Sequence, residues 1–244
     1  MIKLGLLLSI LVSWNHLAES NDSQSIIKKI DAFRVPYEQF LVRTRLYAYE
    51  GNRVKETALF DAYINGNEKS LVVQKEGKNR DMKILYVEEK MWVQLPSSRR
   101  PIRITPIQRL MGQASNGDVA MVSYGDDYTA ELKSEEIVNK VQCHKLLLTA
   151  RKKSATYHKI FLYVQKFDYR PVKAEFFLIS GKHFKTAIYD AYMRIGNQTI
   201  LKKMTIYDEL RKDQKTIFEY EKINEQRIAA KYFNKNYLVH VRGL

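Results

Sequence analysis

Apolar and polar residues alternate with a period of two along most of this 244-residue chain. Near its start, Phe40, Val42 and Leu46 fall on one side of the alternation, and Arg43 and Arg45 fall on the other. Successive side chains of a β-strand point to opposite faces of a sheet, so the pattern is typical of strands that bury one face. The chain is therefore predicted to be mainly β.

Short polar turns, such as the hairpin-favouring Asn65-Gly66, divide the pattern into separate strands. Five strands are predicted before the middle of the chain, at 40–48, 56–64, 70–74, 82–88 and 91–95. Seven more are predicted after it, at 128–134, 141–150, 157–165, 172–179, 184–195, 200–210 and 216–223. A long sheet in simple up-and-down order twists and curls. We expect a single strongly curved antiparallel meander, an unclosed half β-barrel with its apolar face inward and Lys, Arg and Tyr outside.

Two terminal segments follow other patterns. Ile26, Ile27, Ile30 and Phe33 recur at helical spacing, which predicts a short amphipathic helix over 23–33 that lies against the sheet. The segment from Ile228 to Leu238 is predicted to be a closing helix or an irregular tail.

The stretch from Met91 to Tyr128 interrupts the alternation. Beyond its first strand it carries apolar, Met-containing residues with helix-like spacing at 108–111 and 118–122. Gly112 and Gly117 lie between these two parts, where they permit sharp turns. An apolar segment in the middle of a meander needs a surface to cover, so we expect a mid-chain helical lid on the concave face of the sheet.

A basic corner precedes this lid. Pro96 and Pro101 bound a loop that carries Arg99, Arg100 and Arg103. Because the loop is expected beside the mouth of the half-barrel, the three arginines are candidates for contact with anionic head groups or with an acidic partner. A solvated turn is the alternative.

Residues 1–20 have the parts of a secretory signal peptide: Lys3, an apolar run over 4–14, and Ala18-Glu19-Ser20 as a cleavage site. The run is shorter than the roughly 20 residues of a membrane span, although a retained anchor is the alternative. The remainder, 21–244, shows no repeat, linker or break in composition. We therefore expect one exported, soluble domain.

The net charge of +14 would suit a nucleic-acid partner, but export argues against one. Many basic residues alternate with apolar ones, as on a solvated sheet face, and the others favour an anionic membrane surface or an acidic partner. Cys143 is the only cysteine, so no internal disulfide can form. It is predicted to be a buried structural thiol that points away from the neighbouring His144.

The sequence contains no Gly-x-Ser-x-Gly, His-Glu-x-x-His or phosphate-binding glycine loop. His144, His158, His183 and His240 are scattered without metal-ligand spacing. We therefore expect no enzyme activity, no catalytic residues, no bound metal and no cofactor. The weaker alternative is an enzyme that acts on envelope lipid or glycan through a site built from distant residues.

The apolar residues of the concave face and lid are candidates for lining a cavity, because methionine adapts to irregular hydrophobic ligands. The alternative is that they fill a solid core. The candidates are Phe40, Val42, Leu46, Met91, Val93, Leu110, Met111, Met121, Val122, Leu162 and Phe176.

The order of several short motifs resembles the outer-membrane lipoprotein-sorting, LolA-like family. These motifs are Met91–Arg100 (MWVQLPSSRR), Gln108–Gly112 (QRLMG), Asp127-Tyr128, Tyr157–Ile160 (YHKI), Arg170–Phe176 (RPVKAEF) and Ser180–Lys182 (SGK). The similarity extends from about Phe40 to Leu238. One difference is Ile64–Asn67 (INGN), where the best-known lipoprotein carriers have an Arg-Pro corner.

This resemblance implies a monomeric carrier in the periplasm of a Gram-negative bacterium that shields the acyl chains of a lipid or lipoprotein on the way to the outer membrane. It also implies transient contact with a membrane surface, an RND- or MMPL-type transporter or an outer-membrane acceptor. The missing Arg-Pro corner leaves the cargo open. The alternative from a different class is a regulatory or scaffold module that binds an envelope protein through the same fold.

Overall fold

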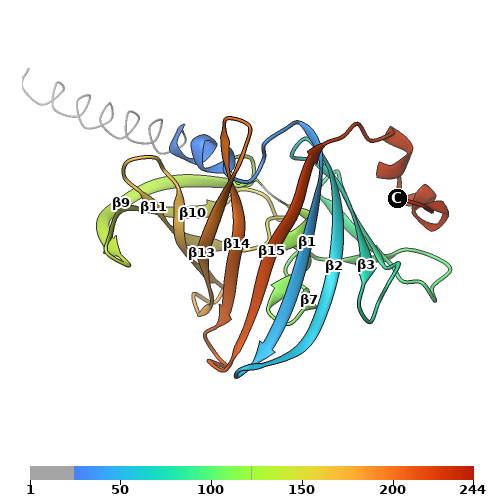
Figure 1. Ribbon diagram of the computed structural model, residues 1–244, viewed down its shortest axis with the longest axis horizontal. Coiled ribbons are helices and arrows are strands. Elements are labelled where there is room, and N and C mark those ends of the chain that lie inside the picture. The colour runs from blue at the N-terminus through green and yellow to red at the C-terminus, as the bar shows by residue number, and fades with distance from the viewer. Residues whose placement is uncertain (1–24, 122) are drawn as a thin grey trace, which may run out of the picture.

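The computed structural model describes residues 25–121 and 123–244, and its main feature is one open antiparallel sheet of 13 strands (Figure 1). The first half of the sheet contains β1 (Gln39–Glu50), β2 (Arg53–Asn65), β3 (Lys69–Glu76), β4 (Lys83–Val87), β5 (Lys90–Gln94) and β6 (Ile102–Ile104). The second half contains β9 (Tyr128–Val138), β10 (Val141–Ala150), β11 (Lys159–Gln165), β12 (Pro171–Phe177), β13 (His183–Ile195), β14 (Gln198–Asp208) and β15 (Gln214–Glu225). The predicted half-barrel is confirmed, and only the edge strand β6 of this sheet was not predicted.

The strand order corrects the expected simple meander. The sheet runs from β6 back to β1, then from β15 back to β9, so the first and last strands pair with each other in its middle. Strands β6 and β9 consequently form the two free edges. Residues 105–127 connect these edges, and we call them the lid segment. Because they cross the sheet instead of forming a hairpin, the strands on either side of them cannot be neighbours.

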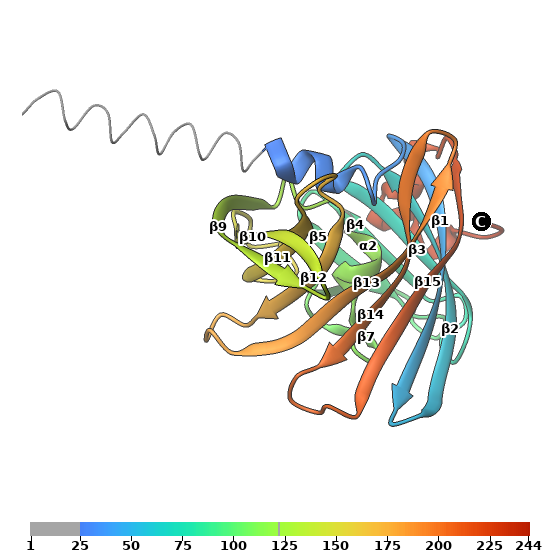
Figure 2. The ribbon, with the colours of Figure 1, turned by 60° about the vertical axis from the view of Figure 1, so that its left-hand side comes forward.

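The main hydrophobic core fills the concave side of the sheet. It joins inward-facing strand residues such as Leu46 and Leu162 with the N-terminal helix, whose described part covers 25–31. Ile26, Ile27 and Ile30 of this helix are at most 2% exposed. The predicted amphipathic helix is confirmed there, and it lies at one end of the half-barrel (Figures 1 and 2).

The lid segment is only partly helical, which corrects the prediction for its first half. Residues 109–111 form strand β7 (Arg109–Met111), which pairs with β8 (Ala114–Ser115), and only the short α2 (Asn116–Ala120) is a helix. Gly112 adopts a φ of +52°, which turns the chain back into a hairpin after too few residues for a helix. Figure 2 shows β7 and α2 inside the curve of the sheet, and α2 contacts β2, β3 and β4.

A second hydrophobic core covers part of the convex side. The C-terminal segment (226–244) contains two short 3-10 helices, η1 (Ala230–Phe233) and η2 (Lys235–His240), in place of the predicted helix or irregular tail. Phe233 and Leu238 pack there against Leu71 and Leu85 of the sheet. The expectation of a polar outer face is therefore wrong here, because these strands are apolar on both faces and need a cover on each.

Cys143 is fully buried and free, which confirms the prediction of a structural thiol. Burial raises the pKa of its thiol. In the described part of the chain, no helix has the length and apolar character that crossing a membrane requires. The predicted signal peptide over 1–20 lies outside the described residues.

Candidate functional site

The concave face brings the predicted cavity candidates into one cluster. Seven of them are buried in the main core: Phe40, Val42, Leu46, Met91, Met111, Leu162 and Phe176. Val93, Leu110 and Met121 are partly buried and pack against this core. Val122 lies outside the described residues.

The concave interior is filled in this structure. Two hollows lined by its residues measure about 20 and 30 Å³, and Arg34 lines both. Each has room for about one water molecule. An acyl chain could therefore enter only if the lid segment moved.

Larger hollows flank the lid hairpin. One of about 450 Å³ is lined by Val93, Ile104 and Leu110. On the other side a hollow of about 260 Å³ is lined by Ile107 and Leu210, which are 39% and 53% exposed. Exposed apolar side chains beside an open hollow form a surface that an apolar ligand can contact first.

Two glycines let the lid segment lie against the sheet without space to spare. A Cβ atom at Gly112 would come within 2.6 Å of the Ala48 Cβ, and one at Gly117 would come within 1.9 Å of the Thr156 Oγ1. Real Cβ contacts are never this short, so the closed position of the lid requires glycine at both places.

Polar contacts hold the lid segment to the sheet. Ser70 Oγ on β3 donates to the carbonyl of Ala120 at 2.7 Å. Tyr157 OH, just before β11, donates to the carboxylate of Asp118 at 2.8 Å. These bonds join α2 to strands from both halves of the sheet, and each contributes only about 0.5–1.5 kcal/mol.

A buried lysine adds a further attachment. Lys185 on β13 is 7% exposed, and its Nζ donates to Ser115 Oγ at 2.8 Å. Burial lowers the pKa of Lys185, while the nearby Asp118 raises it. Because the acceptor Ser115 belongs to the lid, lifting the lid would break this hydrogen bond.

Asp31 joins the N-terminal helix to the other end of the lid segment. Its carboxylate accepts hydrogen bonds at 2.7 Å from Ser123 Oγ and from the backbone N–H groups of Tyr124 and Gly125. Burial raises the pKa of Asp31, and the hydrogen bonds from these backbone groups partly offset the rise. The helix and the lid are thus linked through one carboxylate.

Tyrosines and an arginine lie beneath this link. The Arg34 guanidinium lies 4.9 Å from the ring centre of Tyr124, and the Tyr124 and Tyr189 hydroxyls are 3.0 Å apart. Burial raises the pKa of Tyr189 well above its ordinary value. These residues were missed from the sequence, because Arg34 lies in an unpatterned connection, Tyr124 lies in the lid stretch outside its predicted apolar halves, and strand tyrosines were expected on the outer face.

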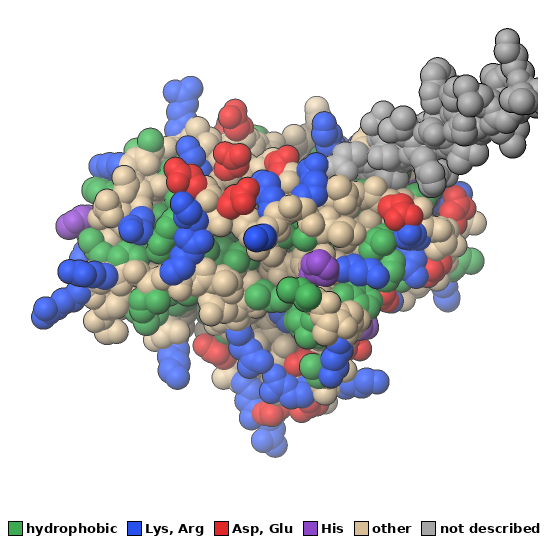
Figure 3. Space-filling model, turned by 180° about the vertical axis from the view of Figure 1, so that it is seen from behind, with side chains coloured by type: hydrophobic (Ala, Val, Ile, Leu, Met, Phe, Trp, Pro, Cys, Tyr) green, Lys and Arg blue, Asp and Glu red, His purple; other side chains and the backbone are tan. Residues whose placement is uncertain are grey.

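The basic corner lies on the convex side of the sheet. Arg103 stacks on Trp92 at 5.0 Å, and Trp92 packs against the convex core. Arg99 and Arg100 are exposed, and Arg99 faces the C-terminal segment across a groove. On the face that Figure 3 shows, Lys and Arg side chains lie among acidic ones rather than in one patch.

The titratable side chains do not gather into a metal site within residues 25–121 and 123–244, where no group of three His, Cys, Asp or Glu side chains could hold an ion. His144 lies 3.7 Å from Glu135, which is mostly exposed. His144 lies on the concave side, because it is opposite Val164 of the concave core, and its ring stacks on Tyr169 at 6.3 Å.

Three solved structures have a fold similar to that of this protein. A LolA superfamily protein from Nitrosomonas europaea is 30% identical over 88% of this chain and 98% of its own, with a TM-score of 0.82. A domain from Vibrio parahaemolyticus assigned to outer membrane lipoprotein-sorting proteins is 17% identical over 90% of this chain and 99% of its own, with a TM-score of 0.75. A DUF1329 family protein from Desulfovibrio piger is 18% identical over the same shares, with a TM-score of 0.74.

The last two similarities show the fold alone. A family model described only as an uncharacterized protein matches residues 66–240, and no curated protein sequence matches the chain. The similarity to the Nitrosomonas europaea protein covers nearly the whole of both chains. The chain therefore belongs to the LolA superfamily.

Proposed function

We propose that the protein is a periplasmic carrier that binds the acyl chains of a lipid or lipoprotein against the concave face of its sheet. The observation that carries this proposal is the lid segment, which covers a largely apolar face but is held by polar side chains and by close-fitting glycines. Membership of the LolA superfamily supports it. The protein is proposed to act without chemical catalysis.

The free energies of hydrogen bonding and of apolar burial favour opening of the lid by an apolar ligand. Releasing the six hydrogen bonds named above that hold the lid segment costs about 3–9 kcal/mol. Burying about fourteen methylene groups of an acyl chain gains about 11 kcal/mol. The gain exceeds the cost, so an acyl chain can displace the lid, whereas a small polar solute cannot. Met111 and Met121 then adapt to the chain that replaces their present contacts.

Transient contact with a membrane surface is part of this proposal. Phe167 and Ile137, at neighbouring hairpin ends, are 91% and 74% exposed. Lys166 follows directly on β11, and Lys140 lies in the turn that follows Ile137. Apolar tips beside basic residues are suited to an anionic bilayer. From the family resemblance we infer an RND- or MMPL-type transporter or an outer-membrane acceptor as the partner.

Native mass spectrometry with lipid extraction tests the carrier function. Protein purified from the periplasm of membrane-containing cells is expected to carry a bound lipid, and a fluorescent fatty acid is expected to displace it. A lipid-free mass with no fatty-acid binding would contradict the proposal. A lipid-free mass with a bound envelope protein would instead favour the scaffold function.

Export has a separate test. N-terminal sequencing of the purified protein is expected to begin near residue 21, after removal of the predicted signal peptide. A protein that still begins at Met1 would show that the segment is retained.

A further inference from the structure

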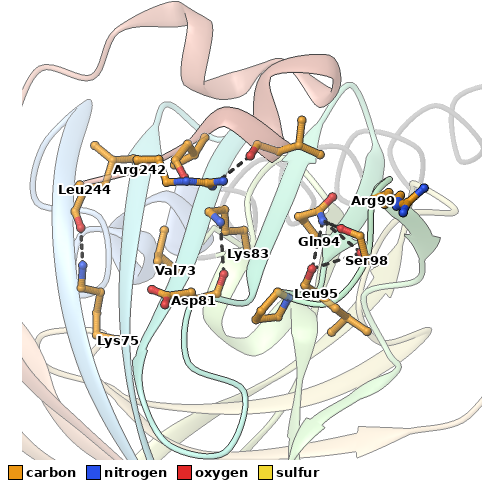
Figure 4. A pocket seen from close by; sticks show the side chains of 14 residues that line it. Val73, Lys75, Asp81, Lys83, Gln94, Leu95, Ser98, Arg99, Arg242 and Leu244 are labelled. Carbon is orange, nitrogen blue, oxygen red and sulfur yellow. Dashed lines mark hydrogen bonds between the residues drawn. The ribbon is translucent and has the colours of Figure 1, made fainter.

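A groove of about 660 Å³ lies on the convex side, outside the lid and the concave core (Figure 4). Its floor is a row of neighbours across three strands: Val73 on β3 pairs with Lys83 on β4, and Lys83 pairs with Gln94 on β5. The C-terminal segment forms one wall through Val241 and Arg242. Three consecutive strands and the distant C-terminal segment therefore build one concave site of the size typical of ligand pockets.

The charges in this groove are mainly positive. Lys75, Lys83, Arg99 and Arg242 line it together with one acidic side chain, Asp81. Lys75 donates to the main-chain oxygen of Leu244, and Arg242 donates to the carbonyls of Val239 and Val241. Within the described residues, none of the four cations forms an ion pair with an Asp or Glu side chain. The field in the groove therefore favours an anion.

Lys83 is the most enclosed of these cations. It is 7% exposed, and its Nζ donates to the main-chain oxygen of Asp81 at 3.2 Å. Burial lowers its pKa, and the neighbouring Arg242 lowers it further. A buried ammonium group with only one long hydrogen bond is costly, and a carboxylate beside it would remove most of that cost.

Gln94 supplies a second unsatisfied group. It is 5% exposed, and its Nε2 donates to the carbonyls of Leu95 and Ser98, which fixes the orientation of the amide. Its Oε1 is buried and has no hydrogen-bond partner. Figure 4 shows this oxygen on the side of the amide away from Ser98. A buried acceptor without a partner is unusual in folded proteins. A ligand that supplies a hydrogen-bond donor to this oxygen would therefore fit the groove.

We propose that the groove binds an acidic, extended peptide segment of a partner protein. A carboxylate of the peptide pairs with Lys83 and Arg242, and a backbone N–H donates to Gln94 Oε1. Apolar side chains of the peptide lie against Val73 and Leu95. The donor must be uncharged, because an ammonium group would be repelled by the surrounding cations.

A peptide fits this site better than a bilayer does. The unsatisfied groups of Lys83 and Gln94 lie on the groove floor, beneath Arg242 and beside Arg99. A membrane surface is too broad to reach them, whereas an extended chain can be inserted lengthwise. Exposed Arg99 and Arg242 at the rim then steer the acidic segment towards the floor.

A phage-displayed library of random short peptides, selected on the full-length protein, tests the proposal. Selected peptides are expected to be enriched in Asp and Glu, and their binding is measured with synthetic labelled copies. Lys83→Met is expected to weaken binding about tenfold, as loss of a charge-assisted hydrogen bond does. Arg242→Gln, at an exposed position, should also weaken binding without affecting the fold.

Lys202→Gln is the matched control, because Lys202 is exposed on β14 and does not line the groove. It removes the same charge and should leave peptide binding unchanged. The proposal is overturned if selection yields no acidic peptides, or if Lys202→Gln and Arg242→Gln weaken binding equally. It is also overturned if vesicles containing anionic phospholipid displace the peptide from the groove, which would assign the site to a membrane. Fatty-acid binding on the concave face should be unaffected by Arg242→Gln, so this test is independent of the carrier function.

Discussion

The two faces of the same sheet are covered in different ways. On the concave side the lid segment is held by polar groups such as Asp31, Lys185 and Tyr157, and it leaves almost no free volume beneath it. On the convex side the C-terminal segment is held by apolar residues such as Phe233, and it leaves an open groove beside it. The first site has to open before it can bind, whereas the second is already formed.

The wall between these sites is strand β4, which is buried along its whole length. Ile84 and Tyr86 belong to the concave core, and Leu85 and Val87 belong to the convex core. Side chains fixed on both faces make a rigid support. Movement on the concave side is therefore expected to be confined to the lid and to leave the convex groove unchanged.

The largest expected effect is the difference in stability between a variant with a charge in the sheet and a variant with the same charge in the lid. Leu162→Asp places a charge in the sheet itself, where it cannot reach water, and should lower the free energy of unfolding by about 3–5 kcal/mol. Met111→Asp places the same charge on the lid hairpin, which can swing outward. Its melting temperature should fall less than that of Leu162→Asp, because the charge can reach water, while fluorescent fatty-acid binding is lost.

Chemical denaturation and fatty-acid titration on both variants check this expectation. If Met111→Asp is as destabilising as Leu162→Asp, the lid does not move. If in addition the wild type binds no fatty acid, Met111 and Met121 are core residues only.

The second effect concerns the convex cover. Phe233 is 6% exposed, and Phe233→Ala should cost about 3 kcal/mol through lost packing. Hydrogen exchange of the C-terminal segment should rise, and peptide binding in the groove should weaken. Fatty-acid binding should not change, because the concave face is untouched. Asn236→Ala, at an exposed position of the same segment, is the control. If hydrogen exchange rises as much in Asn236→Ala as in Phe233→Ala, Phe233 does not anchor the segment.

The elements that alternate regularly could be predicted from the sequence, and those held by long-range contacts could not. Val141–Ala150 was predicted with the bounds that it has, because apolar and polar residues alternate over its length and turns flank it. The pairing of β1 with β15 joins residues far apart in the chain, and no local pattern encodes it.

In the candidate site, too, the features set by local alternation could be predicted and those set by long-range contacts could not. Its apolar residues could be found from their alternation, as Leu46 and Leu162 were. Its polar contacts could not, because Asp31 meets Tyr124 only after the lid segment has crossed the sheet. The orphan oxygen of Gln94 likewise becomes evident only when its neighbours are in place.

A smaller effect on stability is expected where Gly117 of the lid contacts Thr156. Gly117→Ala places a Cβ where Thr156 lies, so the lid cannot seat fully, and we expect a loss of about 1–3 kcal/mol in stability. Fatty-acid association should become faster, because the lid is partly raised. Adding Thr156→Gly restores the space and should restore the slow association. Equal association rates for the wild type and Gly117→Ala would show that lid seating does not limit access.

The smallest effect is a pH dependence at the link between helix and lid. Burial raises the pKa of Asp31 in the folded protein above its ordinary value of 3.8. A group with a raised folded-state pKa contributes stability that is fully present below its unfolded pKa and is lost as the pH rises through the folded pKa. Acidification from neutral pH towards the ordinary pKa of 3.8 should therefore stabilise the wild type relative to Asp31→Asn, which does not titrate. Ser123→Ala should behave in the opposite way. It removes a hydrogen bond that lowers the pKa of Asp31, so this variant gains more on acidification, and its difference from the wild type should narrow. Denaturation curves at several pH values measure both differences. Parallel pH profiles for the three proteins would show that the Asp31 carboxylate is not buried between the helix and the lid.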